Sequence, residues 1–250
     1  MPPPLPDIRA LAARQWRDYQ RRTPGTYFGE AHAPLHLSDA YRLQREVARL
    51  RQMAGDRMIG YKIGCIGPGI VEQFGMAGPI RGTLYESEMR PSGATLAHAD
   101  YANLAIEGEM AVAIGPGETI VGAFPVIELH HFVFRGASKT LVELVANNGL
   151  NAGVVLPHDP ALPLERWAGS QALTIRINGD AVASGGLWSM PGGAAEAVAW
   201  LGAHLKEWGL HLAPGDLVLT GTPLGLHPVQ PGDAVAVSVD GATFAECEII

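Results

Sequence analysis

The chain has 250 residues, a net charge of −7 and a pI of about 5.7, which argues against the basic surface of a nucleic-acid-binding protein. Its 31 glycines and 19 prolines favour a β-rich fold with many turns over a helical bundle. No apolar run approaches the roughly 20 residues that span a bilayer, and the N-terminus lacks the basic-then-apolar order of a signal peptide. We therefore expect a cytoplasmic protein that engages neither membranes nor nucleic acids.

Two helices are predicted at the N-terminus. The first follows a proline-rich start, with apolar residues at helical spacing from Ile8 to Tyr19. The second begins at residues 37–39, where Ser38 or Asp39 is expected to cap it. Its inward side is expected to hold Ala40, Leu43, Val47 and Leu50, and its basic side, expected to be solvated, holds Arg42, Arg45, Arg49 and Arg51.

The remainder of the chain is predicted to be mostly strands with a few helices between them. Helices are expected at 138–148, capped by Ser138, and at 192–209, ended by Gly209, with a helical turn at 69–78. The predicted strands are 58–64, 103–115, 124–134, a hairpin of 172–177 and 181–186 around Asn178-Gly179-Asp180, 216–221, 234–241 and 243–250. We expect one α+β catalytic domain over residues 1–250, with a helical segment, 1–55, packed outside a β core.

Three acids stand out in the apolar strands. Glu107 and Glu109 are two residues apart, so their side chains share one face of the strand. If buried together, they require a proton or a cation. Glu128 is a lone acid in the next strand, and three carboxylates form the hard oxygen site that Mg²⁺ or Mn²⁺ prefers. The alternative is a half-exposed strand with solvated charges.

Two further residues are candidates for the same site. His130 follows Glu128 by two residues on the same strand face, although a core or edge histidine with satisfied nitrogens explains it equally simply. Lys62 is the only charge in a glycine-flanked apolar strand. Near a metal, its burial is expected to lower its pKa and suit it to proton transfer. An edge-strand lysine that blocks aggregation is the alternative.

The order of these segments resembles the 2-keto-4-pentenoate hydratase / 2-oxo-3-hexenedioate (4-oxalocrotonate) decarboxylase family of the fumarylacetoacetate hydrolase superfamily. The resemblance runs from about Leu37 to the C-terminus, through SDAYRLQ, GYKIG, PIRGTLY, IEGEMAVAIG, PVIEL, ELVANNGLNAG, GDLVLTGTPLG and QPGD. It implies a mixed β roll with N-terminal and peripheral helices, a Mg²⁺ or Mn²⁺ centre, a small 2-oxo acid substrate and a homo-oligomer.

The resemblance also implies roles for individual residues. Metal ligands are expected at Glu107, Glu109 and Glu128, and a proton-transfer lysine at Lys62. Substrate contacts are expected from Asn148 and from the loop Thr220, Gly221 and Thr222. Asn148 has an alternative as a helix C-terminal residue with local hydrogen bonds.

One position departs from the family pattern. Ile80 stands where hydratases carry an acid that assists proton transfer, whereas decarboxylases tend to have an apolar residue there. The adjacent Arg81 is a candidate to bind a second substrate carboxylate through two hydrogen bonds, with a surface arginine as the alternative.

The expected function is that of a divalent-metal-dependent lyase. A hydratase of 2-hydroxypenta-2,4-dienoate-like 2-oxo acids, as in the meta-cleavage degradation of aromatic compounds, comes first. A 2-oxo-3-hexenedioate decarboxylase is the alternative because of Ile80, followed by an acylpyruvate-type C–C hydrolase and a non-catalytic paralogue.

Overall fold

The computed structural model describes residues 7–31, 34–66, 79–160 and 162–250. Its α-helices are α1 (Ile8–Gln20), α2 (Leu37–Met53), α4 (Leu141–Ala146) and α5 (Gly193–Glu207). Its strands are β1 (Met58–Gly64), β2 (Ile80–Tyr85), β3 (Met89–Pro91), β4 (Ala94–Leu96), β5 (Leu104–Ile114), β6 (Ile120–His131), β7 (Asn151–Leu156), β8 (Ala172–Ile177), β9 (Asp180–Gly186), β10 (Leu217–Leu219), β11 (His227–Pro228), β12 (Ala234–Val239) and β13 (Ala242–Ile249). The helical turn expected at 69–78 lies outside the described residues.

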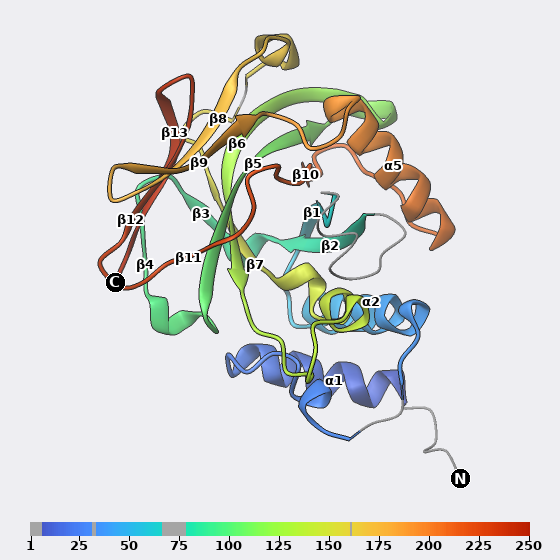
Figure 1. The fold of residues 1–250 in the computed structure, drawn as a ribbon. Coiled ribbons are helices and arrows are strands. Elements are labelled where there is room, and N and C mark those ends of the chain that lie inside the picture. The colour runs from blue at the N-terminus through green and yellow to red at the C-terminus, as the bar shows by residue number, and fades with distance from the viewer. Residues whose placement is uncertain (1–6, 32–33, 67–78, 161) are drawn as a thin grey trace.

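A curled mixed sheet forms the centre of the molecule (Figure 1). Its strand order is β2-β1-β10-β5-β6-β7-β3, and β11 also pairs with β5. The long antiparallel pair β5–β6 runs from Leu104 opposite His131 to Ile114 opposite Ile120. Strands β1 and β10 are parallel, as are β3 and β7, so the sheet is mixed.

Side chains of this sheet alternate between two faces. We call the face that carries Glu107, Glu109 and Glu128 the carboxylate face, and the opposite one the packed face. A second sheet, ordered β4-β13-β12-β8-β9, packs its Ile175 and Val237 against the packed face. A smaller apolar cluster lines the carboxylate face; its buried members are Leu84, Ala111, Phe124, Val126, Val154, Leu217 and Leu219.

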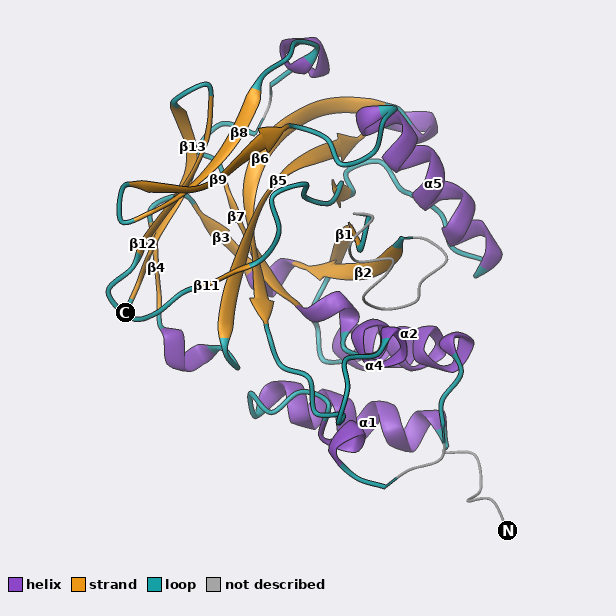
Figure 2. Ribbon diagram, in the orientation of Figure 1, coloured by secondary structure: helices purple, strands orange, loops and turns teal. Residues whose placement is uncertain are grey.

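Helices cover the margins of the sheets, as the ribbon in Figure 2 shows. α1 and α2 lie against each other, and α2 is joined to β2 and α4 by the buried Gln44, which donates to the carbonyls of Arg81 and Val145 at 3.0 Å each. α5 buries one apolar side in the main core, through residues such as Leu201 and Leu205. The expected α+β arrangement is confirmed. Among the described residues, no helix combines the length and apolarity needed to cross a membrane.

The helices and strands predicted within the described residues are present, but two predicted caps are not. α2 begins at Leu37, so Ser38 and Asp39 lie inside its first turn, and Asp39 pairs with Arg42 instead. α4 begins at Leu141, and Thr140 rather than Ser138 caps it by accepting from the Glu143 amide at 3.2 Å.

The basic side of α2 is not solvated throughout. Arg51 is buried, with ion pairs of 2.6 Å to Asp56 and 2.7 Å to Glu88, and its guanidinium lies 3.5 Å from the centre of the Tyr85 ring. The prediction was wrong for this residue because Asp56, five residues on, and Glu88, distant in the chain, compensate the burial of its charge.

Candidate metal centre

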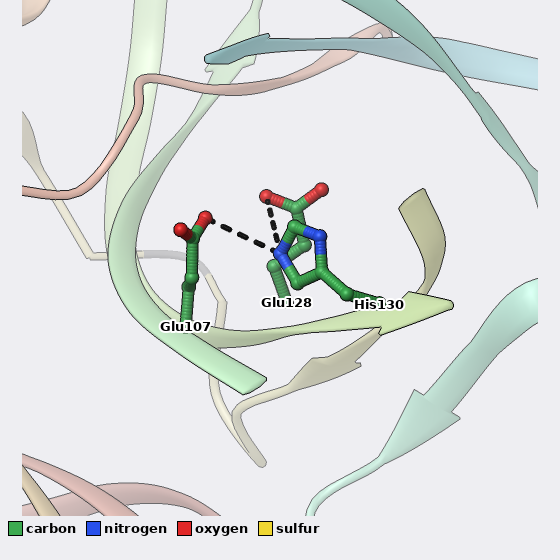
Figure 3. Close-up of side chains that lie close together, drawn as sticks. All are labelled: Glu107, Glu128 and His130. Atoms are coloured by element: carbon green, nitrogen blue, oxygen red, sulfur yellow. Dashed lines mark ion pairs between the residues drawn. The ribbon is translucent and has the colours of Figure 1, made fainter. Parts of the chain in front are cut away.

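Two acids and a histidine converge on the carboxylate face (Figure 3). Glu107 of β5 lies directly opposite Glu128 of β6, and His130 follows on the same face of β6. His130 Nε2 is 3.2 Å from Glu107 Oε2 and 3.5 Å from Glu128 Oε2. One ligand atom from each of the three residues lies within 4.8 Å of those of the other two.

Glu109 lies beside this group, two residues along β5 from Glu107. It is fully buried, and as a carboxylate neither of its oxygens meets a donor, whereas in its neutral form it hydrogen-bonds to Glu128. Burial, followed by the charges of Glu128 and Glu107, raises the pKa of Glu109 well above its usual range. The tight group is therefore Glu107, Glu128 and His130, with Glu109 next to it, rather than the three glutamates alone.

Lys62 reaches the carboxylate face from β1. It lies opposite Leu219 of β10, which lies opposite Ala111 of β5, so the three side chains share one face. Lys62 Nζ lies 3.2 Å from Glu128 Oε1. Burial lowers the pKa of Lys62, but Glu128 and Glu107 outweigh it, so the pKa is raised. Without a bound metal the lysine faces carboxylates, and its ammonium form is favoured; the lowering expected beside a metal stays a prediction.

Asn151 is a contact that the sequence did not reveal. Its Nδ2 donates to Glu128 Oε1 at 2.7 Å, while its Oδ1 is buried without a partner. Burial raises the pKa of Glu128, but Lys62, His130 and Asn151 outweigh burial, so the pKa is lowered and Glu128 is held as a carboxylate. Asn151 is the first residue of β7, a strand that was not predicted. The sequence signal for it was a polar residue directly before the apolar run AGVVL.

The loop after β10 lies against β5 beside the acids. The hydroxyl of Thr220 donates to the carbonyl of Met110 at 2.8 Å, and that of Thr222 donates to the carbonyl of Gly108 at 2.6 Å. Gly221 between them has a φ of +84°, and a Cβ there would lie 2.4 Å from Ile66 Cδ1. The loop is thus fixed against β5, and its hydroxyl hydrogens are already used.

The side chains of two expected substrate contacts have other partners. Gly82 is paired with Lys62 and shares the carboxylate face with it. The side chain of the adjacent Arg81 therefore points to the packed face. It is only 1% exposed, so the surface-arginine alternative is wrong as well. The Asn148 side chain bonds the backbone N–H and carbonyl of Thr83 at 2.7 and 2.8 Å, and so caps the edge strand β2 across 65 residues instead of bonding locally.

Ile80 is a neighbour of Lys62. A Cβ added at Gly64 would lie 3.1 Å from Lys62 Nζ and 3.7 Å from Ile80 Cγ1. The departure noted in the sequence therefore places an apolar side chain, rather than an acid, beside the lysine.

The residues present fit a divalent cation. When Glu109 is ionised, its two buried oxygens lack a donor, the Oδ1 of Asn151 is buried without a partner, and the Nε2 of His130 faces only carboxylate oxygens. Unsatisfied buried acceptors are costly, and the carboxylate oxygens of this group are the ligands that Mg²⁺ or Mn²⁺ prefers.

The chain is similar in sequence to known proteins. Residues 147–250 match the fumarylacetoacetate (FAA) hydrolase C-terminal family. The chain is 27% identical to a 2-keto-4-pentenoate hydratase of Paraburkholderia phymatum, over 96% of this chain and 98% of that protein. It is 26% identical to a 4-oxalocrotonate decarboxylase of Pseudomonas sp. strain CF600, over 86% of each.

A solved structure has the same fold. The 4-oxalocrotonate decarboxylase of Pseudomonas putida G7, complexed with magnesium and adipate, superposes with a TM-score of 0.84 at 24% identity, over 97% of both chains. The expected mixed β roll of the fumarylacetoacetate hydrolase type is confirmed by this match. The chain is thus similar to 2-keto-4-pentenoate hydratases and 4-oxalocrotonate decarboxylases, and its residues 147–250 match the fumarylacetoacetate hydrolase C-terminal family.

Proposed function

We propose that this chain is a divalent-metal-dependent lyase that hydrates 2-hydroxypenta-2,4-dienoate-like 2-oxo acids in the meta-cleavage degradation of aromatic compounds. The observation that carries the proposal is the convergence of Glu107, Glu128 and His130 beside the buried carboxyl of Glu109. These residues would hold Mg²⁺ or Mn²⁺. The names of the curated relatives support the reaction class, and the magnesium bound by the solved relative supports the cofactor.

The chain's own residues account for proton movement. A divalent cation, when bound, supplies a Lewis acid that polarises the 2-oxo group of the substrate. Lys62 holds a proton on Nζ, 3.2 Å from Glu128, and is placed to pass it to the substrate carbon during ketonisation. Asn151 and Lys62 together orient the Glu128 carboxylate. The Thr220–Thr222 loop, fixed along β5, is the proposed contact for the substrate carboxylate.

A decarboxylase is the second candidate, and Ile80 favours it. An apolar side chain beside Lys62 supplies neither a second proton donor nor a group that activates water. Loss of carbon dioxide requires no attacking water, so this surrounding suits decarboxylation. One curated relative and the solved relative are named 4-oxalocrotonate decarboxylases, and the latter binds the diacid adipate.

The remaining parts of the proposal concern the whole chain. We propose that residues 1–250 act as one catalytic domain, with the helical segment 1–55 packed on its β core. We also propose that the chain works as a homo-oligomer in the cytoplasm. The match along nearly the whole length of full enzymes supports a single catalytic unit.

Proton NMR of the Mg²⁺-loaded protein tests the reaction. The protein is mixed separately with 2-hydroxypenta-2,4-dienoate and with 2-oxo-3-hexenedioate. A 4-hydroxy-2-oxo product from the first is the expected result and identifies a hydratase, whereas carbon dioxide released from the second identifies a decarboxylase. If neither compound changes faster than in buffer with Mg²⁺, the lyase proposal is wrong.

A further inference from the structure

Arg81 is a buried cation without an anionic partner. Its side chain is 1% exposed, and only Nη1 makes a hydrogen bond, donating to Gln44 Oε1 at 2.7 Å. Nε and Nη2 are buried without partners, and no acid pairs with Arg81 within the described part of the chain. An unpaired charge in such a position costs several kcal/mol unless something compensates it.

Aromatic rings compensate the charge only in part. The Arg81 guanidinium lies 4.9 Å from the centre of the Tyr41 ring and 5.9 Å from that of Trp208. Such contacts attract a cation but use none of its N–H donors. Burial also lowers the pKa of Arg81, as expected for a cation that lacks a counter-charge.

A cavity of about 570 Å³ lies beside Arg81, between α2 and the strands β1 and β2. Arg81 lines it together with Tyr61 and Thr83, which lie opposite each other on the two strands. The volume is in the range of small-molecule sites, roughly 300–1,000 Å³.

The walls of this cavity are strongly basic. α2 contributes Arg42, Arg45 and Arg49, and α1 contributes Arg9. Among the described residues, the one acid that lines the cavity is Glu46, which pairs with Arg49 at 2.9 Å. Arg45 donates to the carbonyl of Trp208 at 3.3 Å. A chain with a net charge of −7 thus concentrates positive charge here.

We propose that this cavity binds a small anion with at least two negative charges, through carboxylate or phosphate oxygens that pair with Arg81 and Arg45. Guanidinium groups recognise both kinds of oxyanion through paired hydrogen bonds. The cavity lies on the face of β2 opposite to Lys62, so it is separate from the candidate metal centre and does not depend on the proposed reaction.

Phosphorus NMR of inorganic phosphate titrated with the full-length protein at low salt tests the proposal. We expect saturable line broadening with the wild type. Arg81→Gln should weaken binding at least tenfold, because a hydrogen bond to a charged group contributes about 1.5–3 kcal/mol and each 1.4 kcal/mol is a factor of ten. Arg45→Gln should weaken it about threefold. Arg166→Gln, which removes an exposed arginine elsewhere, should leave binding unchanged.

Three further results decide the proposal. Succinate is then added as a competitor. If it displaces phosphate, the site accepts carboxylates, and if it does not, the site is specific for phosphate. Both results support an anion site. Binding that is lost in Glu107→Gln but kept in Arg81→Gln would place the anion at the metal centre and overturn the proposal. Absence of saturable binding of both anions would overturn it too. If Arg81→Gln does not fold, the test uses Arg45→Gln, because Arg45 is exposed. Unchanged phosphate binding in that variant would then overturn the proposal.

Discussion

Lys62 and His131 are both buried bases, yet their surroundings shift their pKa values in opposite directions. Lys62 faces the acids of the carboxylate face, which raise its pKa. His131 accepts a hydrogen bond from the Ala102 amide on Nδ1 at 2.9 Å, and burial, followed by the charge of His130, lowers its pKa to about 4. Two bases within one core therefore have different protonation states at neutral pH.

His131 makes stability depend on pH. Its pKa is about 4 in the folded state and about 6.5 when unfolded. The unfolded state therefore binds more protons than the folded state. The contribution of His131 to stability is lost as the pH falls from 6.5 towards 4. Between pH 7 and pH 5, the free energy of unfolding in urea should fall by about 2 kcal/mol more in the wild type than in His131→Asn. Equal losses in the two proteins would contradict the assigned protonation.

Lys62 is predicted to act on turnover rather than on metal binding. Lys62→Met keeps the size of the side chain but removes the proton, so turnover should fall at least about a hundredfold. The Mn²⁺ affinity should be preserved or increased, since a positive charge is removed beside the ligands. Steady-state kinetics and Mn²⁺ titration of the same variant separate the two effects. Turnover within tenfold of the wild type would show that Lys62 is not the proton-transfer group.

At the residue scale, periodicity was enough to predict the positions of the acids. The two-residue period of β5 placed Glu107 and Glu109 on one face, and the apolar surroundings of Glu128 indicated its burial. The Asn151 contact and the direction of the Lys62 pKa shift could not be predicted in this way. Both depend on neighbours brought together by strand pairing across the sheet.

The strand β5 serves two surfaces at once. Its odd-numbered residues carry the acids, while its even-numbered residues pack against the second sheet. Gly108 is the point of closest approach, because a Cβ there would lie 2.6 Å from Ile175 Cγ1 and 3.0 Å from Val237 Cγ2. The absence of a side chain allows the second sheet to support the strand segment that carries Glu107 and Glu109.

Gly108→Ala should therefore destabilise the fold. The added methyl must displace Ile175, and such overpacking costs about 1–3 kcal/mol. Gly186→Ala on the exposed strand β9 is a matched control, because a Cβ there meets no atom within 4 Å, and its effect should stay within about 0.5 kcal/mol. Equal unfolding free energies for the two variants in denaturant titrations would contradict the close sheet contact.

Elements with clear periodicity were predicted and others were missed. The hairpin β8–β9 was predicted from Asn178-Gly179, both of which have positive φ. β7 lacks polar–apolar alternation because it is buried on both faces, whereas β2 alternates at Arg81 and Thr83 and yet is buried along its entire length. A short continuous apolar run does not distinguish a buried strand from other buried segments, so tertiary pairing was needed to identify them.

At the scale of the whole molecule, composition predicted a β-rich α+β chain, but not how its sheets are arranged. The β roll was expected only through the ordered resemblance over most of the chain. Local periodicity does not specify which strands pair across long separations, such as β1 with β10. The choice between hydration and decarboxylation also depends on the neighbourhood of Lys62 and Ile80, and fold alone does not decide it.

Direct titration of Mn²⁺ by calorimetry, after removal of bound metal with EDTA, tests the central claim that the carboxylate face is a metal centre. We expect one saturable site in the wild type and in Glu246→Gln, which alters an exposed acid on β13. We expect loss of that site in Glu107→Gln, whose partly exposed side chain can be changed with little effect on folding. A wild type that binds no Mn²⁺, or a Glu107→Gln variant that binds it as tightly, would contradict the metal assignment.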